Sequence, residues 1–164
     1  MNRAISNTSP PLYLHRIGRL DWLPEIFTEI IVPSAVVNEL REGRQKGYDS
    51  PDLSTYTWLQ IVEPISIPAN LTVGDLGLGE QTAIALALEN FGFVVLLDDG
   101  LARSTAQALG LTVWGTLKIL LTAKSQGLTE QIAPLVDQLQ NAGMWISDDI
   151  RSRVLNLAGE CDRS

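Results

Sequence analysis

The chain has 164 residues, a length that suits one domain, and its 45% hydrophobic content is enough for a core of its own. No apolar run approaches the roughly 20 residues that span a bilayer, and the first residues are too interrupted for a secretory signal, so we expect a cytoplasmic protein without membrane contact. The single cysteine, Cys161, excludes an internal disulfide and a cysteine-based zinc site. The net charge of −7 excludes binding of nucleic acid over the whole surface, so RNA would need bound metal or a local basic patch.

Short extended and helical segments alternate in the first third of the chain. Asn7-Thr8-Ser9-Pro10 ends an apolar-leaning run, and proline there suits the first turn of a helix. A β-branched run, EIIV, is typical of a buried strand. The predicted elements are a strand at 3–6, a helix from about 10 to 18, a helix at 20–27, a strand at 29–32, and a helix that opens at Pro33-Ser34 and frays into a loop over 41–50.

Glycines and prolines divide the rest of the chain. Residues 61–62 and 65–67 flank Pro64, so any strand there must be short or lie at an edge. After a loop at 74–79, residues 80–89 are apolar almost all round, which predicts a helix buried between layers. Residues 93–97, FVVLL, form a continuous apolar run typical of a parallel strand. We also expect helices at 101–109, 116–125, about 130–140 and 148–157, and a strand at 111–114.

This alternation predicts the α/β class, as a three-layer α/β/α sandwich with a mostly parallel central sheet. We expect a single domain over residues 1–164, in which the residues from about 129 onward form a helical extension. Ligands of such sheets bind at the carboxyl ends of the strands, so the polar residues at those ends are the candidates for function.

Oxygen-bearing side chains occur at several of these predicted strand ends and helix starts. Mg²⁺ prefers oxygen ligands, keeps several waters and takes one or two carboxylates directly. Without a cation, several close carboxylates would repel one another. The candidates are Asn7, Thr8 and Ser9 after the first strand, Glu39 in the helix after the second, Glu80 in the first turn of the buried helix, and Asp98 and Asp99 after the strand at 93–97.

Metal-assisted hydrolysis is the most economical chemistry for this set, because the chain has one histidine and no evident serine–histidine–acid arrangement. For each acid a structural role is open as well: complement to a helix dipole, a solvated helix face, or a turn with a capping aspartate. One candidate basic cluster consists of Arg41, Arg44 and Lys46, whereas other cations are scattered along the later chain, at Arg103, Lys118 and Lys124. The simpler interpretation is that all of them lie on solvated helix faces. The four tryptophans read as core or interface residues rather than base-stacking platforms.

Several motifs in order resemble the PIN domain, and most closely its prokaryotic VapC-like branch. They are SNTSP at 6–10, VPSAVVNEL at 32–40, LGE at 78–80, LLDD at 96–99 and AGMWIS at 142–147, so the resemblance covers nearly the whole chain. It implies a PIN-like α/β/α fold and an endoribonuclease that depends on Mg²⁺ or Mn²⁺. It further implies the toxin of a toxin–antitoxin pair, with RNA as substrate, a small antitoxin protein as partner, and homodimers.

Carried over by position, the resemblance assigns roles to the candidate residues. Asn7 departs from the family pattern, because the first strand usually ends in aspartate and asparagine is neutral. The implied catalytic residues are Glu39, Glu80, Asp98 and Asp99; the implied metal ligands are Glu39, Glu80, Asp98 and Asn7; and Thr8, Ser9, Arg103 and Thr116 would position water or substrate.

Two other functions are open at this stage. The neutral Asn7 favours a PIN-like module that binds RNA or a protein without cutting. A receiver-like signalling domain, with Asp98 or Asp99 accepting phosphate, would instead need an acidic cluster at the end of the first strand, where this chain has Asn7. The sequence does not decide whether Asp98 or Asp99 faces a metal.

Overall fold

A five-stranded sheet forms the centre of the molecule in this computed structural model, which describes residues 2–161. The strand order is β3-β2-β1-β4-β5, and all four pairings are parallel. The predicted, mostly parallel sheet is therefore parallel throughout, and every strand ends at the same edge. The strands are β1 (Asn2–Ser6), β2 (Phe27–Val32), β3 (Leu59–Ile61), β4 (Phe93–Leu96) and β5 (Val113–Trp114).

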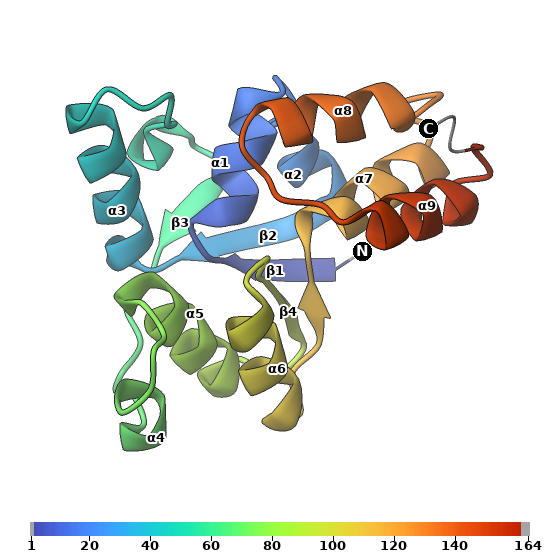
Figure 1. The fold of residues 1–164 in the computed structure, drawn as a ribbon. Helices are drawn as coiled ribbons and strands as arrows, with labels where there is room; N and C mark the ends of the chain where they lie inside the picture. The colour runs from blue at the N-terminus through green and yellow to red at the C-terminus, as the bar shows by residue number, and fades with distance from the viewer. Residues whose placement is uncertain (1, 162–164) are drawn as a thin grey trace.

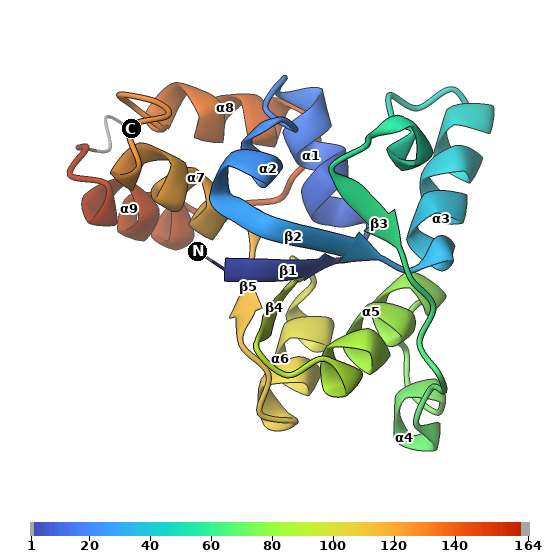
Figure 2. The same ribbon diagram turned by 180° about the vertical axis from the view of Figure 1, so that it is seen from behind.

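Helices cover both faces of the sheet, which gives the predicted α/β/α layers (Figure 1). The view from behind in Figure 2 shows the same division, with α3 (Ser34–Gln45) standing at the end of the sheet beside β3. One face carries α1 (Ser9–Arg16), α2 (Trp22–Ile26), α7 (Thr116–Ser125), α8 (Ala133–Asn141) and α9 (Asp148–Leu157), and the other carries α4 (Ala69–Thr72), α5 (Leu78–Glu89) and α6 (Gly100–Ala108).

The strands send alternate side chains into two apolar cores, as the two-residue period of a strand requires. Ala4 belongs to the core under α1 and α7, whereas Ile5 belongs to the core under α5 and α6. Because both faces are buried, the strands read as continuous apolar runs in the sequence. Leu139 of α8 and Leu155 of α9 are fully buried in the first core, so the C-terminal helices pack into the same core as α1 and α7.

The structure differs from the predicted elements at two places. α3 continues to Gln45 instead of fraying after Leu40, because arginine, glutamate and glutamine are good helix formers and their side chains point largely to solvent there. The edge strand β3 lies before Pro64 rather than around it, since proline has no N–H for the ladder. Within residues 2–161, no helix combines the length and the apolar character needed to cross a bilayer.

Candidate functional site

The residue that follows β1 lies in the middle of the carboxyl edge, because β1 is flanked by β2 and β4. The last residue of β1, Ser6, pairs with Leu96 of β4. The next residue, Asn7, donates its backbone N–H to the Leu96 carbonyl at 3.1 Å. Asn7 is 4% exposed, and its Oδ1 is buried with no hydrogen-bond partner among residues 2–161. Buried polar atoms are nearly always paired, so this oxygen marks a place for a donor or a cation.

Glu39 links the end of β1 to the start of α5. Thr8 Oγ1 donates to Glu39 Oε2, and the Gly79 backbone N–H donates to Glu39 Oε1 at 2.9 Å. A Cβ on Gly79 would lie 2.6–2.9 Å from the atoms of the Glu39 carboxylate, so this approach needs glycine. The position also suits a carboxylate, because the first turn of a helix attracts negative charge.

Glu80 carries a charge that its surroundings disfavour. Its Oε1 accepts a hydrogen bond from the Gly77 N–H at 3.0 Å, which closes the first turn of α5. Burial raises the pKa of Glu80; the Gly77 hydrogen bond opposes this, and the charges of Asp99 and then Glu39 raise the pKa further. Three carboxylates on α3, α5 and the start of α6 therefore repel one another at the edge of the sheet.

Asp98 lies at the end of β4 and holds the start of α7. Thr116 donates to Asp98 twice, from its N–H to Oδ1 at 2.8 Å and from its hydroxyl to Oδ2 at 2.7 Å. Burial nevertheless raises the pKa of Asp98, against the Thr116 hydrogen bonds and the Arg103 guanidinium, which lower it. Arg103 Nη1 donates to the Leu97 carbonyl at 3.0 Å, and a Cβ on Gly115 would lie 2.9 Å from Arg103 Nη1 and 3.2 Å from Asp98 Oδ1.

Asp99 and Ser9 have simpler surroundings. Asp99 is exposed and caps α6, where its carboxylate accepts a hydrogen bond from the Ala102 N–H at 3.0 Å. Ser9 opens α1 and is half-buried, and no hydrogen bond joins its side chain to the acids among the described residues. Of the Asp98-Asp99 pair, Asp98 is therefore the more enclosed and Asp99 is the one that caps a helix.

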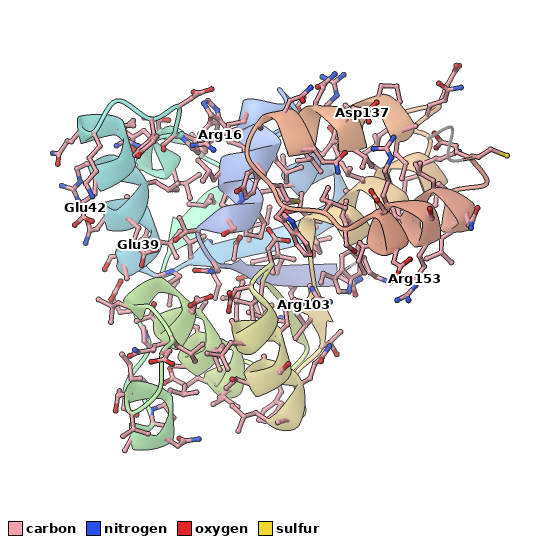
Figure 3. All side chains as sticks on the ribbon, in the orientation of Figure 1. Arg16, Glu39, Glu42, Arg103, Asp137 and Arg153 are labelled. Atoms are coloured by element: carbon pink, nitrogen blue, oxygen red, sulfur yellow. The ribbon has the colours of Figure 1, made fainter. Side chains whose placement is uncertain are left out.

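The carboxyl edge thus gathers negative charge from separate elements. Figure 3 shows Glu39 projecting from α3 and Arg103 from α6, two helices that flank this edge. Among residues 2–161, none of the four carboxylates Glu39, Glu80, Asp98 and Asp99 forms a salt bridge. This edge therefore carries negative charge that no salt bridge among the described residues balances.

The candidate side chains at this edge would bind a cation through oxygen atoms, and oxygen ligands suit a hard divalent cation better than they suit zinc. However, no three histidine, cysteine, aspartate or glutamate side chains within residues 2–161 stand close enough to enclose an ion. The structure therefore does not contain a ready cage of Glu39, Glu80 and Asp98, because each is held by its own hydrogen-bond donors and like charges repel. A hydrated Mg²⁺ or Mn²⁺ needs only one or two carboxylates directly, so these residues, with the Asn7 oxygen, fit such an ion.

Comparison with known proteins identifies the family of the chain. A family model described as PIN domain matches residues 3–160. The chain belongs to the PIN-domain family. PIN domains are generally nucleases and typically use divalent metals, so this chain is a nuclease-type module.

A solved structure confirms the fold of this PIN domain. A PilT N-terminus domain protein from the hyperthermophilic archaeon Sulfolobus solfataricus P2 is similar, with a TM-score of 0.54 and 16% sequence identity over 73% of this chain and 92% of that chain. At this identity the likeness shows the fold alone. No curated protein matches the chain.

Sequence analysis missed two residues that shape the site of this PIN domain, Gly79 and Gly115. Each leaves space for a carboxylate, Glu39 at Gly79 and Asp98 at Gly115. The sequence predicts a loop at 74–79, but α5 already begins at Leu78. For Gly79 the sequence does offer a signal, a glycine directly before an acid at the start of an apolar helix. The sequence cannot show which side chain packs against that glycine, because the contact comes from a distant segment.

Proposed function

We propose that this PIN domain is an endoribonuclease that hydrolyses RNA phosphodiester bonds with Mg²⁺ or Mn²⁺ at the carboxyl edge of its sheet. The observation that supports this most is the buried Asn7 oxygen, which has no hydrogen-bond partner within the described residues. It lies at an edge where burial and the charges of Asp99 and Glu39 raise the pKa of Glu80 and where none of these acids forms a salt bridge within the described residues. We further propose that it is a cytoplasmic toxin of the VapC-like kind, a homodimer restrained by a small antitoxin protein. This finer role rests on the resemblance of its motifs.

In this proposal different residues bind the cation, accept a proton and orient the carboxylates. Glu39, Asp98 and the Asn7 oxygen would hold the cation, directly or through water. A divalent cation bound there makes water more acidic and balances the charge of the phosphate. Oε1 of Glu80 is occupied by the Gly77 N–H, which leaves Oε2 for the cation or for the proton of the attacking water. The hydroxyls of Thr8 and Thr116 donate to the carboxylates of Glu39 and Asp98 and so orient them. In this proposal Ser9 and Arg103 would contact water or the substrate phosphate.

Replacing Glu80 by Gln tests the proposal. Glutamine keeps an oxygen for the Gly77 N–H but removes the charge, so we expect RNA cleavage to fall about 10- to 100-fold while the fold persists. The measurement is cleavage of a labelled single-stranded RNA with Mn²⁺, with Mg²⁺ and with a chelator. Glu42→Gln, an exposed acid of α3, is the matched control. Equal rates for wild type and Glu80→Gln, or cleavage that persists in the chelator, would end the proposal.

The same variant provides a readout that does not depend on activity. Because the raised pKa of Glu80 means that the fold disfavours its charge, Glu80→Gln should raise the melting temperature of the metal-free protein at neutral pH. Wild type regains this stability once Glu80 is protonated, so the difference should shrink as the pH falls toward the ordinary value of 4.5. Mn²⁺ should raise the melting temperature of wild type more than that of the variant.

Replacing Gly79 by Ala should separate the position of Glu39 from the stability of the fold. The added Cβ would overlap the Glu39 carboxylate, so that side chain must leave the Gly79 N–H, and we expect about a tenfold loss of cleavage. The melting temperature should not fall much, since alanine favours a helix over glycine by about 1 kcal/mol. Gly74→Ala, where the new Cβ meets open space, is the control. If both variants cleave RNA at the same rate, the placement of Glu39 is irrelevant to the reaction.

A second function, binding of RNA or protein without cleavage, is favoured by one observation: the residue after β1 is the neutral Asn7. Wild type would then lack metal-dependent cleavage, and Asn7→Asp would gain it. Robust turnover by wild type would exclude this alternative.

A further inference from the structure

A cleft of about 530 Å³ opens beside the candidate active site. It lies between α6, α7 and the segment that joins α8 to α9, which Figure 1 shows running back toward the sheet. Asp98 and Arg103 line the cleft, so whatever fills it sits next to the carboxyl edge. The volume lies within the range of small-molecule and cofactor pockets in proteins.

The walls of this cleft are largely apolar, and an aromatic ring stands among them. Leu117 and Leu121 of α7 line it together with Ile146. Trp145 also lines it and is 86% exposed, in contrast to Trp22, which is 6% exposed in the core. Of the two roles expected for the tryptophans, core or interface, the core is therefore excluded for Trp145. It leaves a large π-face open to a ligand.

Two cations accompany this ring in a chain whose net charge is −7. Arg103 lies beside Asp98, and Lys118 lines the cleft with its Nζ 5.1 Å from the centroid of the Trp114 ring. A flat apolar surface with neighbouring cations complements a nucleotide, whose base stacks on aromatic rings and whose phosphate is anionic. A hydrophobic protein segment would use the apolar walls but not the cations.

The segment that carries Trp145 is held at several points. Arg16 Nη1 donates to the Ala142 carbonyl at 3.0 Å, and Gln140 Nε2 donates to the Ile146 carbonyl at 3.3 Å. Immediately after it, Ser147 caps α9. A ring presented on an anchored segment loses little freedom when a ligand stacks on it, which favours binding.

We propose that this cleft is a subsite for one unpaired base of the RNA, stacked on Trp145, with Arg103 and Lys118 contacting the adjoining phosphates. The subsite rests on the proposed function in that the RNA is the substrate of the neighbouring carboxylates. Trp145 is then a positioning residue that holds a nucleotide next to the scissile bond. Bases inside a duplex are stacked on one another, so the subsite selects single strands.

The test is binding of a fluorescein-labelled single-stranded RNA, followed by anisotropy in a chelator so that no cleavage occurs. Trp145→Ala should weaken binding about tenfold or more, and Trp145→Phe should restore most of it. Phe91→Ala removes another exposed aromatic side chain, 76% exposed and outside this cleft, and should bind as wild type does. Single-stranded RNA should also quench the intrinsic fluorescence of wild type more than that of Trp145→Phe, whereas a duplex should quench both equally.

Equal affinities for Trp145→Ala and Phe91→Ala would overturn the subsite, and so would a wild type that binds no single-stranded RNA. If sedimentation shows that Trp145→Ala only dissolves a dimer, a second copy covers the cleft and the subsite is wrong. The nuclease proposal fails separately: wild type that binds RNA through Trp145 but never cleaves it with Mn²⁺ contradicts that proposal alone.

Discussion

Replacing Asn7 by Asp should lower the melting temperature of the metal-free protein by roughly 10 °C at neutral pH. Asn7 is 4% exposed, and its Oδ1 has no partner among residues 2–161, so a carboxylate there would be buried and uncompensated. An uncompensated buried charge costs about 3 kcal/mol or more, and each kcal/mol is worth roughly 2–4 °C in a domain of this size. The new carboxyl would resist ionisation, so its pKa in the folded protein would lie above the ordinary value, and the loss should shrink as the pH falls from neutrality and be gone below about pH 4.

Mn²⁺ should reverse this loss, because a cation at the carboxyl edge would balance the added charge. We expect the melting temperature of Asn7→Asp to rise with Mn²⁺ several times more steeply than that of wild type, and the Mn²⁺ concentration for half-maximal cleavage to fall about tenfold. Asn2→Asp, the same change at the exposed start of β1, should behave as wild type. If Asn7→Asp has the same melting temperature as wild type in a chelator, and Mn²⁺ does not change it, the Asn7 oxygen does not face a cation site.

Replacing Asp98 by Asn should reduce RNA cleavage on the order of 100-fold or more, whereas Asp99→Asn should reduce it by less than about tenfold. Asp98 is half-buried and held by Thr116, and asparagine can still accept from the Thr116 N–H, so charge is the main loss. Asp99 is exposed and caps α6, and asparagine caps a helix as well as aspartate does. Each substitution removes one charge and keeps the shape.

Rates measured side by side with Mn²⁺, together with melting temperatures, decide between the two neighbouring acids. Comparable losses of cleavage would show that Asp99 leaves its capping contact to serve the reaction. A large loss for Asp99→Asn alone would reverse the assignment. A fall in melting temperature for Asp98→Asn would mean that its contacts to Thr116, rather than its charge, explain part of the effect.

Much of the fold follows from the sequence, because long apolar patterns determine which segments are buried. The run at 93–97 became β4, and residues 83–87 of the apolar stretch are buried in α5. The edge strand β3 was placed too late, since a three-residue strand paired only to β2 leaves little pattern to recognise. Likewise, the polar residues that extend α3 to Gln45 follow helix propensity and not hydrophobicity.

The composition of the site was easier to predict than its geometry. The order of the strands brings the residues after β1 and β4 to one edge, so the sequence could predict candidate acids at the strand ends and helix starts around it. It could not show that Thr8 and Gly79 hold Glu39, or that Thr116 holds Asp98, because these contacts depend on side-chain directions between distant segments. For the same reason the expected cage of three carboxylates is not preformed within the described residues.

The place of β1 between β2 and β4 bears on when this site first exists. β2 follows β1 closely in the chain, so these two strands can pair while the protein is still being synthesised. The other edge of β1 can pair only after β4 has been synthesised. Asp98 gains its hydrogen-bond partner only when Thr116 has left the ribosome. A nascent chain shorter than this therefore carries the acids without their arrangement, and a translating ribosome is not exposed to the completed site until α7 begins to form.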